Sequence, residues 1–162
     1  MAGNKKSTKP DEELVNICRN KRALHEYEIF DALECGIVLT GTEVKSLREH
    51  AASLEDAYAK IEDRELWLIG SDIPEYTMGN RLNHKPKRPR KLLLHRRELD
   101  KFAGKASQQG FTLIPLRMYF KKGRAKVEIA VARGKKLYDK RQSQKKAEAA
   151  KEIRKAMKDR RR

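Results

Sequence analysis

The sequence predicts a mainly β domain, a closed or nearly closed barrel of about six short antiparallel strands with about three helices. Short runs in which apolar and polar residues alternate recur along the chain, and glycine or proline separates many of them. One longer segment, 92–109, has apolar residues at helical spacing instead. Hydrophobic residues make up 38% of the 162 residues, enough for one small core. Short strands in this number favour a barrel, because closure removes exposed strand edges.

The chain is expected to divide into three segments. Residues 1–13 are polar and are predicted to be a disordered leader. Residues 14–134 carry the alternating patterns and are predicted to form the barrel. The core-forming pattern stops after Gly134, so residues 135–162 are predicted to form a separate basic tail.

The first half of the folded segment is expected to contain helical turns and a pair of strands. Residues 14–23 suit one or two helical turns. Residues 25–39 are predicted as two strands, because the apolar pattern breaks at a tight turn near residues 34–36. Thr42 suits the N-cap of a short helix over residues 43–49, since a threonine hydroxyl can accept from a free backbone N–H.

A hairpin and a loop should follow. Residues 57–61 and 65–69 are predicted to pair across Asp63 and Arg64, with Leu66 and Leu68 on one face and Trp67 and Ile69 on the other. A strand that is apolar on both faces is usually covered on both. Residues 71–91 contain three prolines and are predicted to be an extended loop.

The second half should contain one helix and the clearest hairpin. Residues 92–109 are predicted as a helix with an apolar stripe through Leu99 and Phe102, ending at Gly110. Residues 111–120 and 127–131 alternate and are predicted to pair across Lys122 and Gly123. Pro115 cannot donate a ladder hydrogen bond, so it marks an edge or a bulge. The side chains of Ile114, Leu116, Met118 and Phe120 are predicted to share one face of the first strand, with Arg117 and Tyr119 on the other.

The charge predicts an anionic partner. The net charge is +16 and the isoelectric point is about 10.0, so phosphate backbones should attract the chain. The sequence has no apolar run long enough for a membrane span and no secretory pattern in residues 1–9. Cys18 and Cys35 lack a paired motif and are expected to be free thiols in a cytoplasmic protein, with a disulfide between them as the alternative.

Enzyme signatures are missing from the sequence. It contains no phosphate-binding or dinucleotide-binding glycine motif, and its four histidines do not approach metal-ligand spacing. Glu43 and Glu49 suit a surface helix better than a catalytic acid pair. We therefore expect no catalytic residue, no metal site and no cofactor.

Two stretches of the folded segment are candidate RNA contacts. Residues 81–97 hold eight lysines and arginines and no acid, with asparagine and histidine interleaved. Arginine can grip phosphates bidentately or stack on bases, although a solvated face would also explain such a run. Around residues 19–22, cations precede Tyr27, which could stack on an exposed base or equally serve as a core strand residue.

The tail is the third candidate. Residues 135–162 hold thirteen lysines and arginines against four acids, together with a narrow apolar stripe that includes Ile153 and Met157. A lone helix of this length is marginal in water, so we expect a tail that is disordered when free and helical in an RNA-lined channel. A merely solubilising tail is the alternative.

Several motifs in order resemble one bacterial family. They are NKRA at 20–23 with His25 and Tyr27, GIVLTGTEVKSLR at 36–48, the residues around 79–84, RPRKLLLH at 88–95 and GKKLYDKR at 134–141. This pattern is similar to that of small protein B, the SsrA-binding proteins. The resemblance runs co-linearly from about residue 20 to residue 141 and more loosely through the tail.

The resemblance implies a fold and a function. It implies an oligonucleotide/oligosaccharide-binding type of barrel, a bacterial cytoplasmic protein partly associated with ribosomes, and no enzymatic activity. The partners it implies are the tRNA-like domain of transfer-messenger RNA, the decoding centre and mRNA channel of the stalled ribosome, and elongation factor Tu indirectly through the RNA. A monomer with no membrane partner is expected. A ribosomal protein or assembly factor that binds ribosomal RNA is the alternative from composition.

These arguments give two sets of candidate residues. The expected RNA-binding residues are Asn20, Lys21, Arg22, Tyr27, Glu43, Lys45, Arg48, Asn80, Arg81, Asn83, His84, Arg88, Arg90, Lys91, Arg124, Lys126 and Arg133. The expected ribosome-contacting tail residues are Lys135, Lys136, Leu137, Tyr138, Asp139, Lys140, Arg141, Ile153 and Met157. The role of Glu43 is left open, because a carboxylate can accept from a base or a 2′-OH or can orient a neighbouring cation.

Overall fold

The structure is a computed structural model that describes residues 14–79 and 82–159. The predicted leader, together with Asn80 and Arg81 of the RNA-binding prediction, lies outside the described residues. The elements follow one another as β1 (Leu14–Arg19), α1 (Lys21–Glu26), β2 (Tyr27–Ile37), α2 (Gly41–Arg48), β3 (Tyr58–Glu62), β4 (Glu65–Ile69), β5 (Arg90–Leu93), α3 (Arg96–Ala106), β6 (Phe111–Lys121), β7 (Arg124–Gly134) and α4 (Leu137–Asp159).

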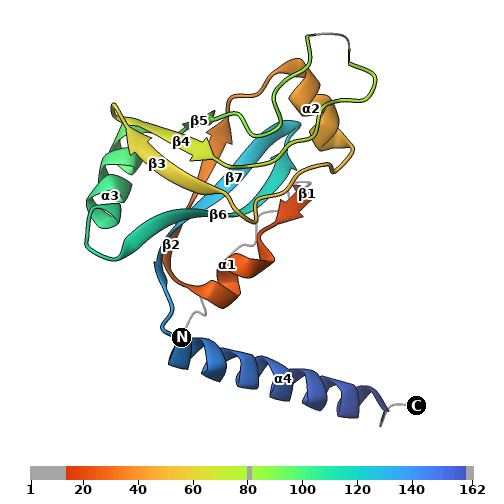
Figure 1. Cartoon of the computed structure of the whole chain (residues 1–162), viewed down its shortest axis with the longest axis vertical. Helices are drawn as coiled ribbons and strands as arrows, with labels where there is room; N and C mark the ends of the chain where they lie inside the picture. Colours follow the sequence, from red (N-terminus) through yellow and green to blue (C-terminus); the bar gives the residue numbers. More distant parts are fainter. Residues whose placement is uncertain (1–13, 80–81, 160–162) are drawn as a thin grey trace, which may run out of the picture.

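Within the described residues, seven antiparallel strands form one sheet in the order β1-β6-β3-β4-β5-β2-β7 (Figure 1). Because β6 also pairs with β7, six of the strands form a closed ring of pairings, and β1 is added to β6. Two junctions of the ring are short. Only Ala59 and Leu113 pair between β3 and β6, and β5 meets β2 through two residue pairs. The predicted mainly β class is confirmed, with a strand ring in place of a uniformly bonded barrel.

The main core fills the ring and extends to two helices. Leu66, Leu68 and Val127 from the strands are fully buried there, and Leu47 of α2 and Phe102 of α3 pack against the same cluster. A smaller cluster on the opposite face of β6 and β7 contains Ala23 of α1 with Ile114, Ala130 and Ala132. The ring is therefore covered at one end by α2, at its side by α3 and on its outer face by α1 (Figure 1).

The N-terminal third differs from the prediction. Residues 14–19 form a strand instead of helical turns, and α1 follows with Asn20 as its N-cap. Residues 27–37 form one continuous strand instead of two, because β7 pairs along most of its length and holds the Cys35–Gly36 region extended. Helix α2 begins two residues earlier than predicted, since Thr40 and Glu43 form a capping box.

The predicted helix over residues 92–109 is too long. Leu92 is buried as part of β5, where it faces Leu66 of β4 and Ile37 of β2. The strand completes the ring, so tertiary pairing overrides the helical propensity of three consecutive leucines. Helix α3 begins at Arg96, after a capping box formed by His95 and Glu98.

Both predicted hairpins are confirmed. The turns have positive φ at Asp63 and Arg64 and at Lys122 and Gly123, as expected for two-residue hairpin loops. The register of β6 shifts between Pro115 and Arg117, so a bulge with Leu116 as its extra residue follows Pro115 directly. The bulge makes the predicted single apolar face wrong, because Met118 and Phe120 belong to the main cluster while Ile114 and Leu116 belong to the small one.

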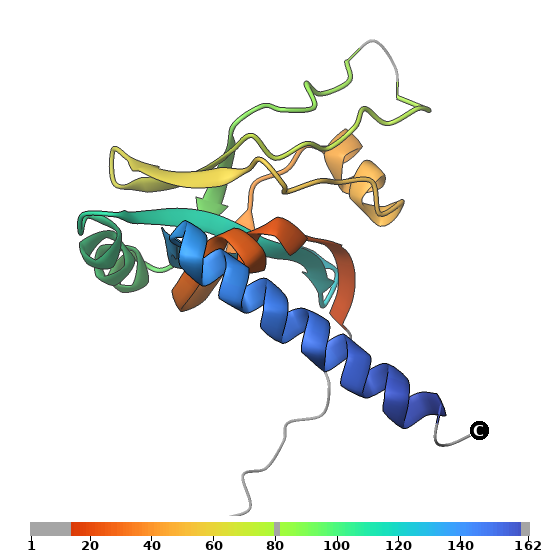
Figure 2. The same ribbon diagram turned by 60° about the horizontal axis from the view of Figure 1, so that its bottom comes forward.

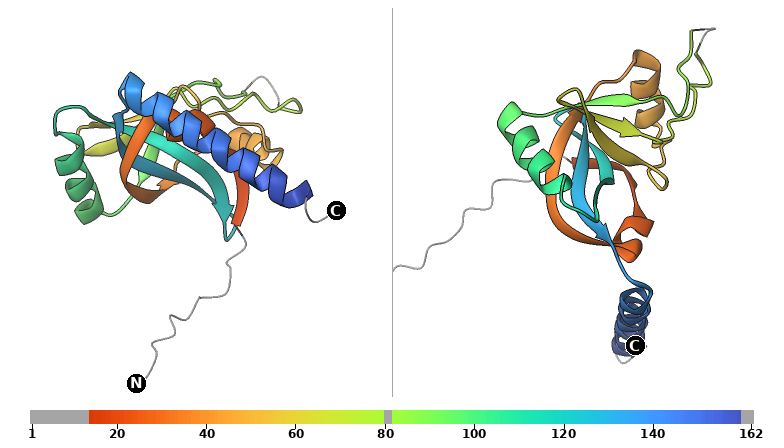
Figure 3. Two further views of the ribbon diagram at one scale, coloured as in Figure 1. Left: turned by 90° about the horizontal axis from the view of Figure 1, so that it is seen from below. Right: turned by 60° about the vertical axis from the view of Figure 1, so that its left-hand side comes forward.

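The tail leaves the end of the ring as helix α4, which extends well beyond the strands (Figures 2 and 3). Its start lies beside α1, where the backbone N–H of Lys135 donates to Glu26 O and the Lys135 ammonium donates to Leu24 O at 2.9 Å. Farther along, Ile153 and Met157 are 58% and 64% exposed. The apolar stripe of α4 is thus open to solvent in the structure.

Hydrogen exchange should show whether α4 persists in the free protein. We expect the amides of residues 143–157 to exchange within about tenfold of unstructured peptides, because a solvated helix of this kind has marginal stability. Amides of β6 and β7 in the same sample serve as the internal control and should be protected by the global free energy of unfolding. Protection of α4 comparable to that of β7 would contradict the predicted disorder.

Candidate RNA interface

A single buried carboxylate fastens the loop between β4 and β5 to helix α2. Glu43 is fully buried. Its Oε1 accepts from Arg88 Nε at 2.8 Å and from Arg90 Nε at 2.9 Å, and its Oε2 accepts from Arg88 Nη2 at 2.5 Å. The backbone N–H of Thr40 also donates to Oε2, at 2.7 Å. One carboxylate therefore closes the α2 capping box and holds the guanidinium groups of Arg88 in the loop and of Arg90 at the start of β5.

The pKa of Glu43 reflects two opposing effects. Burial raises it, because the charged form loses solvation. Hydrogen bonds from Arg88 and the Thr40 amide, with the charge of Arg90, outweigh burial and hold the pKa below its ordinary value. The carboxylate is ionised at neutral pH, and two arginines against one glutamate leave this cluster with a net positive charge.

Arg90 lies inside the protein. Its side chain has no exposed surface, and Nη1 donates to the Ser71 backbone oxygen at 2.7 Å and to Ser71 Oγ at 2.8 Å. Nη2 donates to Pro86 O at 2.8 Å. The guanidinium of Arg90 is thus buried and bonded to partners within the protein, and the RNA contact expected of this residue stays a prediction.

His84 and Asn83 also form hydrogen bonds that fix the loop, one of them to helix α2. The buried ring of His84 joins Thr42 Oγ1 through Nδ1 and Ile73 O through Nε2, each at 2.9 Å. Because a carbonyl can only accept, Nε2 carries the proton that is donated to Ile73 O. Asn83 Nδ2 donates to Tyr76 O at 2.8 Å. These bonds position the His84 ring within the protein, and the RNA contact expected of His84 stays a prediction.

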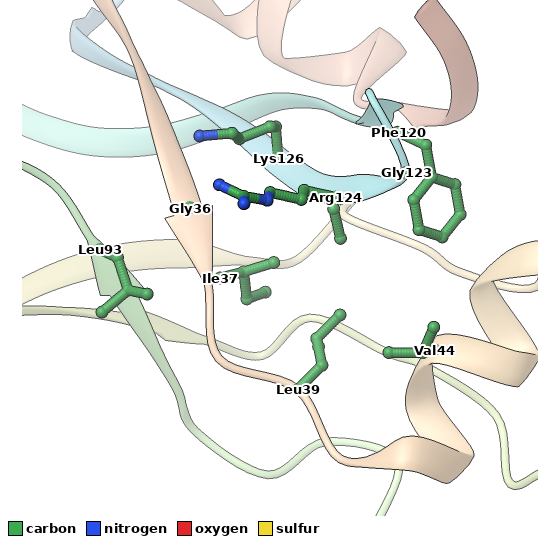
Figure 4. Close-up of a pocket in the computed structure, with 10 residues that line it drawn as sticks. Gly36, Ile37, Leu39, Val44, Leu93, Phe120, Gly123, Arg124 and Lys126 are labelled. Atoms are coloured by element: carbon green, nitrogen blue, oxygen red, sulfur yellow. The ribbon is translucent and has the colours of Figure 1, made fainter.

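A groove lies between the start of β7, the end of β2 and α2 (Figure 4). Its volume is about 400 Å³, and it is lined by Gly36, Ile37, Leu39, Val44, Leu93, Phe120, Gly123, Arg124, Ala125 and Lys126. The apolar side chains form the floor, and the side chains of Arg124 and Lys126 lie next to each other on one side (Figure 4). A Cβ on Gly36 would meet Leu93 Cβ at 3.3 Å, so glycine permits the close approach of β2 and β5.

A second hollow of about 510 Å³ continues past Leu93 and Lys126, which line both. It adds Glu34, His95 and Glu98. Glu34 accepts from the hydroxyl of Tyr119 at 2.5 Å and pairs with Lys126 at 3.8 Å. Burial raises the pKa of Glu34, but the bonds from Tyr119 and Lys121 hold it below its ordinary value.

The combined groove offers the three kinds of contact that RNA needs. Leu93 is 51% exposed between the two hollows and can pack against a ribose or base. Arg124 and Lys126 can neutralise phosphates, and Glu34 can accept from an amino group or a 2′-OH. By contrast, no group of three or more histidine, cysteine or acidic side chains suited to a metal ion occurs among residues 14–79 and 82–159.

Comparison with known proteins places the chain in a family. The family model described as SmpB protein matches residues 17–159. The chain belongs to the SmpB family. The SsrA-binding protein of Desulforudis audaxviator is 55% identical over 140 residues, which cover 86% of this chain and 92% of that protein. The SsrA-binding protein of Brucella canis is 49% identical over 158 residues, or 97% and 99% of the two chains.

A solved structure supports the same assignment. Its description reads "tmRNA-SmpB: a journey to the center of the bacterial ribosome", and one of its chains matches with a TM-score of 0.64 and 48% identity. The match covers 74% of this chain and 85% of the other. The family resemblance found in the sequence is therefore confirmed.

The remaining predicted RNA contacts of this SmpB-family chain are spread over several surfaces. Asn20 is buried, because it caps α1 and donates to Leu54 O and Pro115 O. Tyr27 is half-buried against the small cluster. The exposed cations are Lys21 and Arg22 on α1, Lys45 and Arg48 on α2, and Arg124 and Arg133 on β7. Lys91 pairs with Glu65 on β4, so it lies apart from the groove cations.

Sequence reasoning missed the apolar part of the groove. The sequence predicts Leu93 as part of a helix. Glu34 was assigned to a turn. The available signal is the run of three leucines after Lys91. Because side chains alternate between the two faces of a strand, a strand that buries one leucine must turn the next to the other face. Only the pairing of β5 with β2 shows that Leu93 opens onto a groove.

Two further expectations concern thiols and membranes. Cys18 and Cys35 are free, and burial raises their pKa to about 11 and about 12, so both are protonated at neutral pH. Among the described helices, none combines the length and hydropathy needed to cross a membrane. Of the predicted tail residues, Lys136 just before α4 and Asp139 in its first turn are exposed.

Proposed function

We propose that this chain is a non-enzymatic adaptor that binds transfer-messenger RNA and acts with it on the ribosome in trans-translation. The observation that carries the proposal is the groove beside Leu93, in which an apolar floor, two cations and an acceptor lie together. The names of the family's members and the ribosomal context of the matched structure agree with this chemistry.

The finer proposal assigns separate tasks to the strand ring and to the tail. The ring would bind the tRNA-like domain of the RNA, and the complex would reach stalled ribosomes with elongation factor Tu bound to the RNA. The tail would then enter the empty mRNA channel, near the decoding centre at residues 139–141 and farther along at Ile153 and Met157. This proposal places the protein in the bacterial cytoplasm as a monomer before it binds.

Recovery of RNA from cells tests the proposal. The full chain, captured with its bound RNA, should enrich transfer-messenger RNA over ribosomal RNA at a salt concentration that removes non-specific contacts. Equal recovery of both RNAs would indicate a ribosomal protein or an assembly factor instead. Preference for ribosomal RNA would contradict the proposal directly.

The groove cations should determine affinity and its salt dependence. We expect Arg124→Gln with Lys126→Gln to weaken binding to transfer-messenger RNA and to lower the slope of log affinity against log salt by nearly one unit for each phosphate that the variant no longer neutralises. Filter binding at four salt concentrations measures both quantities. Lys60→Gln, on the hairpin and paired with Glu62, is the matched control and should leave the slope unchanged. An unaltered slope in the double variant would remove the groove from the interface.

A further inference from the structure

An exposed aromatic side chain lies at the end of the closed sheet where the tail begins. Phe30 on β2 is 48% exposed, although phenylalanine is normally buried. Its ring packs edge-on against Phe111 of β6, with centroids 5.0 Å apart. The Arg133 guanidinium of β7 lies 5.3 Å from the centroid of Phe30 and 5.6 Å from that of Phe111. Three strands thus contribute one aromatic–cation cluster.

The backbone aims Phe30 at this position. The pairing of β2 with β7 shifts register between Ile29 and Asp31, so Phe30 is the extra residue of a bulge. A bulge re-aims a side chain that would otherwise follow the strand. On the neighbouring strands, Arg133 faces Phe111 across the ladder. The cluster therefore follows from the bulge and the register together.

The surroundings favour an RNA base over a protein surface. Glu28 pairs with Arg133 at 3.6 Å, and Asp31 pairs with Lys105. The centre of a protein interface is depleted in charged side chains, whereas a single ring beside a cation suffices to stack a base. The cationic tail begins two residues after Arg133. The Phe30 side chain therefore lies next to a segment whose positive charge would attract RNA.

We propose that Phe30, with Phe111 and Arg133, forms a stacking platform for an unpaired RNA base at the root of the tail. This inference rests on the proposed RNA-binding function but concerns a surface separate from the groove at Leu93. The base stacks on the open face of Phe30, and Arg133 holds the ring in place while adding a cation beside the base. Two RNA sources have this chemistry, namely transfer-messenger RNA and ribosomal RNA.

Binding of full-length variants to each RNA tests the platform. Phe30→Leu keeps an apolar side chain but loses the aromatic face, and Phe30→Trp keeps the face. We expect Phe30→Leu to bind at least about fivefold more weakly and Phe30→Trp to bind as the unchanged protein does. Tyr58→Leu is the matched control, because Tyr58 is an equally exposed aromatic on β3, 46% exposed, outside the cluster. Melting temperatures establish that each variant is folded.

The two RNA arms identify the source of the base. Weaker binding of Phe30→Leu to purified transfer-messenger RNA assigns the base to that RNA, and weaker binding only to small ribosomal subunits assigns it to ribosomal RNA. Unchanged binding of Phe30→Leu in both arms overturns the platform. Equal losses for the leucine and tryptophan variants also overturn it, because they indicate a packing role.

A third probe separates failure of the platform from failure of the proposed function. A short single-stranded RNA that contains 2-aminopurine loses fluorescence when that base stacks. Quenching by the unchanged protein and by Phe30→Trp, but not by Phe30→Leu, supports the platform even if transfer-messenger RNA is not preferred. Equal quenching by all three proteins contradicts it.

Discussion

Replacement of Glu43 by glutamine should lower the free energy of unfolding by about 3–5 kcal/mol, since the change leaves a buried guanidinium without its counter-charge. Arg90 has no exposed surface, and among the described residues its guanidinium donates to no carboxylate other than that of Glu43. Arg88, which is 29% exposed, can turn to solvent. Urea denaturation followed by circular dichroism measures the difference, with the same slope against urea expected for both proteins.

The effect of the Glu43 substitution should depend on pH. The folded-state pKa of Glu43 is below its ordinary value of 4.5, so its charge stabilises the folded chain above the unfolded pKa. That contribution is lost as the pH falls through the folded pKa. The difference between Glu43→Gln and the unchanged protein should therefore be constant near neutral pH and shrink as the pH is lowered below about 4.5.

Glu65→Gln provides the control for an ion pair that water reaches. Glu65 and Lys91 are each 38% exposed, so loss of their pair should cost only about 0–1 kcal/mol. A cost for Glu43→Gln no larger than that of Glu65→Gln would contradict the account of a buried network. The Glu43→Gln variant also tests how Glu43 affects RNA binding. If the folded variant loses affinity for RNA and its loop amides lose protection from hydrogen exchange, Glu43 acts by holding the loop in place.

The parts of the fold that sequence predicted well are local. The hairpins at residues 58–69 and 111–134 need only alternation along two strands that are adjacent in the sequence and a two-residue turn between them. The missed parts are set by distant pairing. Leu92 is a strand residue because β4 and β2 flank it, and Cys35 lies in a continuous strand because β7 runs beside it.

The candidate site shows the same limit for charge. Sequence identified a run of cations at residues 81–97, but it could not say which of them face solvent. Glu43 lies 45 residues from Arg88 and 47 from Arg90 in the chain. Its ion pairs leave Arg88 partly exposed and Arg90 fully buried. Arg124 and Lys126 gain importance only because β7 starts beside Leu93 of β5. Composition thus predicted the partner class, and tertiary contacts selected the residues.

Ending the chain after Gly134 should abolish tagging on stalled ribosomes while changing affinity for transfer-messenger RNA by less than about tenfold at physiological salt. Strand β7 ends at Gly134, so the strand ring and the groove remain complete. Residues 135–162 carry thirteen lysines and arginines and four acids, so some affinity should be lost at low salt, where non-specific contacts contribute most. Binding assays and a reconstituted tagging reaction measure the two effects separately.

Two controls separate the length, the charge and the apolar stripe of the tail. A chain that ends after Asp159 removes only three arginines and should retain tagging. Ile153→Ser with Met157→Ser keeps every charge but removes two side chains that are 58% and 64% exposed in α4. If that stripe is buried in a channel, the serine variant should be defective in tagging but should bind transfer-messenger RNA with unchanged affinity. A large loss of affinity on truncation would instead make the tail the main RNA-binding element, because the ring alone would then be unable to hold the RNA.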